Sequence, residues 1–266
     1  MRKTNYHTHT ARCMHANGKD EEYVLAAIEA GYEELGFSDH TPWKYDSNFV
    51  AHMRMRLDQF DEYYNSIKKL QEKYKDKIKI LIGLECEYYP RYMKWLETFI
   101  KEYKLDYIIL GNHYYDTDEK RIYYGRYCND DSYVKKYIDG AIEGMKTGLY
   151  SYIAHPDLFM RGKIDFDDFA KEESYRLCKV AKELNIPLEY NLAGAQYNEE
   201  LGIEQYPHRE FWKIAAEVGN KAIIGVDAHD PAALKTDYYR NQAIERLKNL
   251  KIEIVDSIDC TKINEK

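Results

Sequence analysis

The sequence predicts an α/β fold built on a parallel sheet, because short apolar runs alternate with long, charged, amphipathic stretches along the chain. No low-complexity linker and no internal repeat interrupts this alternation, so we expect residues 1–266 to form a single domain. The pattern leaves open whether the sheet is open or closed. Seven runs have the length and composition of strands: 4–9, 34–40, 78–88, 107–114, 150–157, 187–191 and 221–229.

Helix-like stretches lie between most of these runs. Residues 20–32 begin with an acidic first turn and have a glycine near their end, as helices commonly do. Apolar residues recur at helical spacing in three longer stretches, 56–75, 130–148 and 169–185. A final apolar run, 251–255, is expected to form an additional edge strand.

The composition is typical of a globular protein, with 44% hydrophobic and 32% charged residues. The net charge of -7 argues against a nucleic-acid-binding protein, although a small anionic substrate is compatible with it. No apolar run approaches the roughly 20 residues of a membrane span, and the N-terminus lacks the apolar core of a signal peptide. Five scattered cysteines without a CxxC motif fit a reducing compartment, so we expect a cytoplasmic location.

The first run contains two potential metal ligands, His7 and His9. Residues i and i+2 of a strand point the same way, so these imidazoles would project together. On a helix the same spacing would separate them by about 200°. Asp227 and His229 have the same spacing at the end of the seventh run.

Further potential ligands stand at or just after the ends of other runs: His15, His40, Glu85, Glu87, His113 and His155. Six of the nine histidines lie in the last residues of a strand-like run. The loops at the carboxyl ends of parallel strands meet in α/β barrels, so these side chains are expected to form one site there. Imidazole and carboxylate ligands suit Zn²⁺, Mn²⁺ or Fe²⁺.

Each of these residues also has an ordinary structural interpretation. A single histidine at a strand end is more often a buried hydrogen-bonding residue than a ligand. Glu85, however, lies in the apolar run "ILIGLECEYY", where burial of an unpaired charge is costly unless a metal binds it. Glu87 shares its face and is the rival carboxylate, whereas Asp39 is expected to support a ligand or cap a loop. Cys13 and Cys86 are expected to face away from the site or to pack.

Four motifs carry a resemblance to a known family. They are "HTHT" followed by His15, "GFSDH", the glutamate of "GLECEY" with "GNHYY" and "AHPD", and "GVDAH". Together they resemble the PHP (polymerase and histidinol phosphatase) superfamily over residues 5–229. The resemblance implies a distorted, TIM-like (β/α)7 barrel with its active site at the C-terminal ends of the strands, and a trinuclear metal centre.

The resemblance also implies which residues hold each metal ion. The first ion would take His7, His9, Glu85 and Asp227; the second would take Glu85, as a bridge, with His113 and His155; the third would take His15, His40 and His229. No ligand is missing, in contrast to superfamily branches that have become structural modules. The metal could be zinc, manganese or iron.

The length of the chain and the segments "SDHTPW" and "GNHYYD" look like the monofunctional histidinol-phosphate phosphatases of this superfamily. That likeness implies hydrolysis of L-histidinol phosphate to L-histidinol and phosphate, a step of histidine biosynthesis. A hydroxide shared by two metal ions would attack phosphorus, with Glu85 and Asp227 as catalytic residues. The alternatives are a nucleotide or nucleic-acid 3′-end phosphoesterase, a phosphotyrosine phosphatase, and a metal-dependent structural domain.

Substrate contacts are predicted from the loops that follow the strands. Arg161 is the first candidate for the phosphate, followed by Arg54 and Arg56, because guanidinium groups bind phosphate in a bidentate way. Each could instead be an ordinary surface arginine. Asp46, Asp116 and Asp118 are candidates for the amine of histidinol phosphate. The expected partner is a small phosphate ester, with neither nucleic acid nor membrane, and the oligomeric state is left open.

Overall fold

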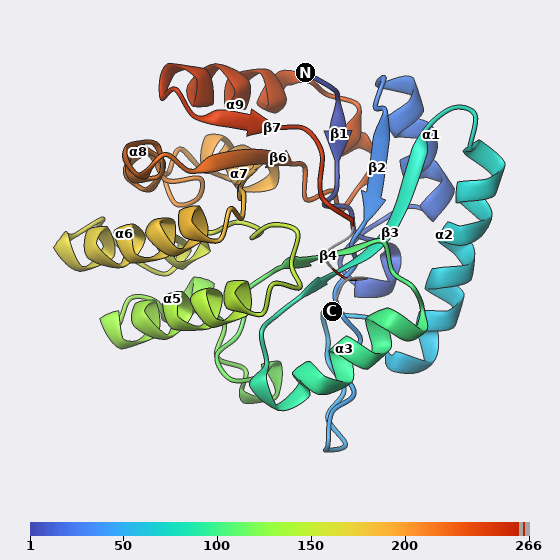
Figure 1. The fold of residues 1–266 in the computed structure, drawn as a ribbon, viewed down its shortest axis with the longest axis horizontal. Coiled ribbons are helices and arrows are strands. Elements are labelled where there is room, and N and C mark those ends of the chain that lie inside the picture. The colour runs from blue at the N-terminus through green and yellow to red at the C-terminus, as the bar shows by residue number, and fades with distance from the viewer. Residues whose placement is uncertain (261–262, 264–266) are drawn as a thin grey trace.

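The structure, a computed structural model, describes residues 1–260 and residue 263. Parallel strands lie at its centre and helices cover them from outside (Figure 1). One sheet has the order β1-β2-β3-β4, formed by Thr4–Asn5, Glu34–Phe37, Lys79–Cys86 and Tyr107–Leu110. The other has the order β5-β6-β7, formed by Leu188–Asn191, Lys221–Gly225 and Glu253–Val255. The predicted parallel α/β fold is therefore confirmed.

Single parallel bridges extend the two sheets toward each other. Ile153 pairs with Leu110 at the end of β4 and with Leu188 at the start of β5. On the other side, Thr8 pairs with Ala228, beyond the ends of β1 and β6. The sheet consequently curls, in the manner of a TIM-like half-barrel. The additional edge strand predicted at 251–255 is present as β7, which pairs with β6.

The strands end earlier than the sequence pattern predicted. β2, β4 and β6 end at Phe37, Leu110 and Gly225, and the run 150–157 contributes only the bridge at Ile153. The prediction that Asp227 and His229 continue a strand is wrong, because Asp227 has a φ of 53° and the chain turns there. Most of the predicted ligands therefore stand on the loops that follow the strands.

The helices predicted from apolar spacing are present with slightly different ends. They are α1 (Asp20–Glu29), α2 (Phe60–Tyr74), α5 (Asp131–Lys146) and α6 (Asp168–Glu183). The side chains of Asp130 and Asp167 cap α5 and α6 by accepting a backbone N–H of the first turn. Five further helices complete the layer: α3 (Met93–Glu102), α4 (Tyr124–Tyr127), α7 (Leu192–Leu201), α8 (Arg209–Val218) and α9 (Tyr238–Asn249).

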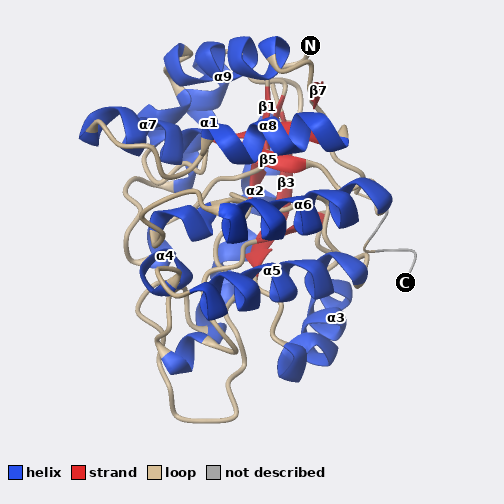
Figure 2. Cartoon of the chain, turned by 90° about the vertical axis from the view of Figure 1, so that its left-hand side faces the viewer, coloured by secondary structure: helices blue, strands red, loops and turns tan. Residues whose placement is uncertain are grey.

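Short 3₁₀ helices occur in the loops, at Ala11–Cys13, Leu57–Gln59, Pro90–Tyr92, Asp118–Lys120, Leu158–Arg161 and Pro231–Leu234. Seen from the side, the strands are enclosed by the helices (Figure 2). Among the helices of the described residues, none combines the length and the apolar character needed to cross a bilayer.

Candidate metal centre

Glu85 lies at the middle of the candidate site. It stands next to the last residue of the apolar strand β3 and is only 1% exposed. The neighbouring Gly111 makes room for it, because a β-carbon at that position would overlap the Glu85 carboxylate. The fold has therefore placed an acid where burial of an unpaired charge would be costly.

Imidazole nitrogens surround both oxygens of this carboxylate. Oε1 of Glu85 lies 3.0 Å from Nε2 of His155 and 3.3 Å from Nε2 of His113. Oε2 faces three more histidines: Nδ1 of His40 at 3.0 Å, and Nε2 of His7 and of His9 at 3.6 Å each. Five histidines from four separate loops thus meet at one glutamate.

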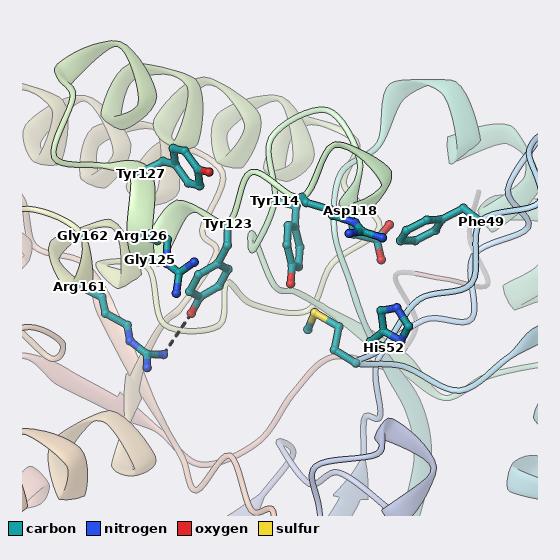
Figure 3. Close-up of a pocket in the computed structure, with 12 residues that line it drawn as sticks. Phe49, His52, Tyr114, Asp118, Tyr123, Gly125, Arg126, Tyr127, Arg161 and Gly162 are labelled. Carbon is teal, nitrogen blue, oxygen red and sulfur yellow. Dashed lines mark hydrogen bonds between the residues drawn. The ribbon is translucent and has the colours of Figure 1, made fainter.

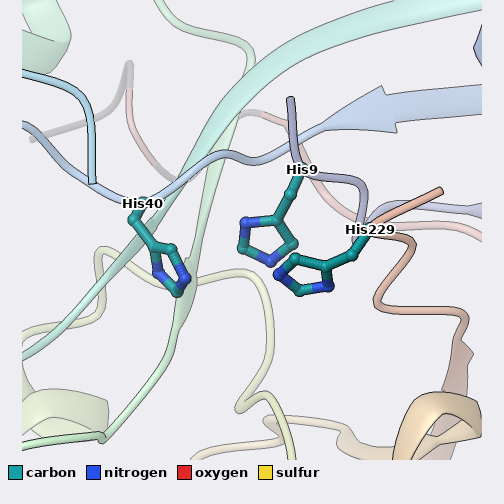
Figure 4. Close-up of side chains that lie close together, drawn as sticks. All are labelled: His9, His40 and His229. Atoms are coloured by element: carbon teal, nitrogen blue, oxygen red, sulfur yellow. The ribbon is translucent and has the colours of Figure 1, made fainter. Parts of the chain in front are cut away.

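Asp227 is the second acid of the cluster. Its Oδ1 lies 3.1 Å from Nε2 of His9, 3.3 Å from Nε2 of His7 and 3.5 Å from Nδ1 of His229. His229 in turn faces His15, with their Nε2 atoms 3.0 Å apart. In Figure 4 the rings of His9, His40 and His229 converge from different segments. All nine ligand positions predicted from the sequence are brought together.

The hydrogen bonding of the described residues fits divalent cations at this site. Oε2 of Glu85, Oδ1 of Asp227 and the Nδ1 atoms of His9 and His40 are buried and form no hydrogen bond, although some of them lie close to one another or to other ring nitrogens. Buried polar atoms in proteins are normally paired. A cation supplies the missing partner for several acceptors at once, so these clusters support the binding of divalent metal ions.

The pKa values of the ligand imidazoles shift in both directions. Burial lowers them, but the neighbouring acids outweigh burial at three rings, and they raise the pKa of His9 to about 9, that of His113 to about 10 and that of His7 well above its ordinary value. Two other rings shift the other way. Burial, together with the nearby His9, lowers the pKa of His40 to about 3 and that of His229 to about 4. Both rings are therefore neutral at physiological pH, as metal coordination requires. Burial alone would raise the pKa of Glu85, but His113, His7 and His40 hold it well below its ordinary value, so the carboxylate is ionised.

Comparison with known proteins places the chain in a family. The model of the PHP domain family matches residues 5–193. The chain belongs to the PHP domain family. This finding agrees with the resemblance carried by the four motifs.

Several relatives of this PHP protein are named histidinol-phosphatases. One, named probable histidinol-phosphatase, from Deinococcus radiodurans, is 31% identical over 236 residues, which are 85% of each chain. The histidinol-phosphatase of Bacillus subtilis is 28% identical over 124 residues, 44% of this chain and 46% of that one. The histidinol phosphate phosphatase of Lactococcus lactis, crystallised with zinc, L-histidinol and phosphate, is 21% identical, with a TM-score of 0.74 over 97% of each chain. The last comparison confirms the fold.

Glu189, which the sequence analysis missed, contacts two of the candidate metal ligands, His7 and His155. Its Oε1 lies 2.8 Å from Nδ1 of His7, and its Oε2 accepts the backbone N–H of His155 at 3.0 Å. Because Nδ1 of His7 is directed at Glu189, Nε2 is the ring nitrogen that faces Glu85 and Asp227. The signal was available: Glu189 is a lone acid in the apolar run "PLEYN", the argument already applied to Glu85.

Two other acids also hold ligands in place. Asp39 is buried, accepts the N–H of His40 at 2.7 Å and lies 3.5 Å from Nδ1 of His9, as expected for a supporting residue. Glu87 lies 3.0 Å from Nδ1 of His113, on the side of the ring away from Glu85. Glu87 therefore contacts a ligand rather than the centre of the cluster.

Arg54 is not placed as a free phosphate-binding group. It is 1% exposed and forms ion pairs with Glu87 at 2.7 Å and Asp118 at 2.8 Å. These pairs fasten its loop to the strand that carries Glu85, because a buried guanidinium needs such partners. They also occupy Asp118, which is therefore unsuitable for a substrate amine. Arg56 lies outside, paired with Asp58.

Arg161, in contrast, lines the metal cavity and has no carboxylate partner among the described residues. Its guanidinium lies 5.9 Å from the ring centre of Tyr123 and 5.1 Å from that of Tyr197.

Cys13 is buried beside the site, and its sulfur lies within 4.8 Å of ligand nitrogens of His15 and His229. Burial raises the pKa of this thiol to about 12, so it stays protonated.

Replacing Glu189 with glutamine is expected to weaken metal binding and kcat/KM by roughly 10–100-fold, because an amide has one acceptor oxygen where the carboxylate serves both His7 and the backbone N–H of His155. Metal titration of the purified variant, followed by kinetics at saturating metal, measures both effects. Glu34→Gln is a matched control, since Glu34 is also buried but pairs with Arg2 at the other end of the sheet. Equal metal affinities in both variants would contradict the role given to Glu189.

Proposed function

We propose that this PHP protein is a metal-dependent phosphomonoesterase that hydrolyses L-histidinol phosphate to L-histidinol and phosphate. The observation that carries the proposal is that eight of the nine ligands line one cavity of about 510 Å³ together with the unpaired Arg161. The ninth ligand, His7, is buried beside Glu85 and Asp227. The relatives named histidinol-phosphatases support this particular ester.

We further propose that the ligands hold three divalent ions, in the sets that the family resemblance implies. His9, which belongs to the first set, also lies next to two ligands of the third ion. Its ring centre is 4.4 Å from that of His40 and 4.1 Å from that of His229. When bound, such ions lower the pKa of water and offset the charge of a phosphate. Zinc, manganese and iron all suit imidazole and carboxylate ligands.

The side chains then have separate tasks in the reaction. Arg161 binds a non-bridging oxygen of the phosphate, because its guanidinium faces the cavity without an acid to neutralise it. Asp227 accepts the proton of the attacking water. Asn191 holds that carboxylate by donating to its other oxygen, Oδ2, at 3.2 Å. The chain thus supplies positioning and charge, on which phosphoryl transfer mainly depends.

The leaving alcohol extends into an outer cavity of about 680 Å³ (Figure 3). Aromatic side chains line it, among them Phe49, Tyr114 and Tyr127, and these suit the imidazole of histidinol. Of the three aspartates predicted to bind the amine, Asp118 lines this cavity but is paired with Arg54, and Asp46 and Asp116 are exposed.

One observation favours a second candidate. Arg121 and Arg126 also line the outer cavity. Neither forms an ion pair with another described residue. Such a cavity suits an ester with additional negative charge, such as a nucleotide.

Kinetics on a panel of esters separates the candidates. For histidinol phosphate, kcat/KM is expected to exceed that for p-nitrophenyl phosphate by at least about a hundredfold, the selectivity that one or two substrate-specific contacts supply. The panel also contains nucleotides, single-stranded DNA and a phosphotyrosine peptide. A preference for any of these three would overturn histidinol phosphate as the substrate and would leave the phosphoesterase assignment intact.

A further inference from the structure

The metal cavity and the outer cavity meet at a shared set of residues. Both are lined by His52, Met53, Tyr114, Tyr123 and Arg161. An ester with its phosphorus at the metal ligands and its alcohol in the outer cavity crosses this junction. The bond that breaks therefore lies beside these five residues. Three of them, His52, Tyr114 and Tyr123, are able to donate a proton.

The hydrogen bonding of Tyr123 directs its proton into the cavity. Nη1 of Arg161 donates to the phenolic oxygen of Tyr123 at 3.2 Å, shown as the dashed line in Figure 3. A hydroxyl group has a single hydrogen to donate, and no group in the described part of the chain accepts it. Because Arg161 also faces the phosphate site, the phenol is placed beside the ester oxygens.

The backbone holds Tyr123 close to the ligand loop. Tyr114 and Tyr123 pair in an antiparallel bridge, and their ring centres are 5.6 Å apart. The next residue, Tyr124, donates its N–H to the carbonyl of His113 at 2.8 Å. This hairpin ties the segment that carries Tyr123 to the backbone of His113, a proposed metal ligand. Burial raises the pKa of the Tyr123 phenol although Arg161 opposes this, so the group is protonated at neutral pH.

We propose that Tyr123 donates its phenolic proton to the ester oxygen of the leaving alcohol. The inference rests on the proposed phosphomonoesterase function and assigns the acid for that reaction. The bond from phosphorus to the ester oxygen breaks as water oxygen bonds to phosphorus, and the phenolic proton completes the alcohol. Water gives one proton to Asp227, and a proton returned through solvent restores the phenol. Arg161 offsets the charge on the phenolate in between.

Tyr123→Phe tests the proposal with two esters of different leaving groups. The alkoxide of histidinol needs a proton to leave, whereas p-nitrophenolate leaves without one. We expect kcat/KM for histidinol phosphate to fall by at least about 100-fold, the lower range of general acid catalysis, and that for p-nitrophenyl phosphate by less than about fivefold. Phenylalanine keeps the ring against Arg161, so cavity shape is preserved.

Tyr114→Phe and His52→Gln are matched controls, because both residues line the same junction. Each is expected to change kcat/KM for the two esters by similar factors. Equal losses on both esters in Tyr123→Phe would overturn the inference and leave the proposed function standing. An ester-dependent loss in either control instead would show that the acid had been wrongly assigned. A wild-type protein that hydrolyses neither ester would overturn both proposals.

Discussion

Replacing Glu85 with alanine is expected to lower kcat/KM by at least about a thousandfold, because a centrally placed ligand of this kind acts together with the whole catalytic unit. The carboxylate lies within 3.6 Å of five imidazoles, so its loss removes the one acid common to the group. Bound metal is expected to fall at the same time. Elemental mass spectrometry of the purified variant and steady-state kinetics measure the two effects.

Glu87→Gln gives the comparison that decides which acid is central. Glu87 contacts His113, Arg54 and Trp43 rather than the middle of the cluster. We expect this variant to lose stability, because Arg54 stays buried with one ion pair fewer, but to keep more activity and more metal than Glu85→Ala. The opposite ranking would show that Glu87 is the bridging ligand.

Removal of divalent metal with a chelator is expected to abolish hydrolysis and to lower the Tm of the protein. The folded chain without metal buries Glu85 and Asp227 with unpaired oxygens, and a ligand that binds only the folded state stabilises it. Activity and Tm should both return when Zn²⁺, Mn²⁺ or Fe²⁺ is added back. Differential scanning calorimetry before and after chelation follows the change.

The metal content of the reloaded protein tests the trinuclear proposal separately. Purified chain that is replete with metal should hold about three ions, as the nine ligands allow. A content that stays at one ion or below would contradict the proposed sets. Full activity after exhaustive chelation would contradict metal-dependent hydrolysis itself.

The sequence predicted the fold well where it depends on local pattern. The alternation of apolar runs and amphipathic stretches gave the parallel strands, and the spacing in 56–75 gave α2. The sequence pattern predicted strands that are too long. Segments that carry ligands, such as 226–229, have the composition of a strand, but their backbone turns. Hydrophobic periodicity reports which side chains are buried, and it does not report a positive φ.

The candidate ligands were also accessible to the sequence, since histidines and acids at the ends of parallel strands gather at one edge of the sheet. The residues that support these ligands were harder to predict from the sequence. Glu189 could have been found as a lone acid in an apolar strand, but its contact with His7 joins residues 182 positions apart. The engagement of Arg54 by Glu87 and Asp118 is likewise a contact between three separate loops.

By itself, the sequence determined the α/β class and the nine potential ligands, because residue type and spacing carry that information. The family motifs added the expected reaction. Only the tertiary structure decided what each buried charge contacts: Glu85 the imidazoles, Glu87 and Asp118 the guanidinium of Arg54, and Arg161 no acid among the described residues. A buried charge must find a partner, and the curl of the sheet selects which distant side chain is within reach.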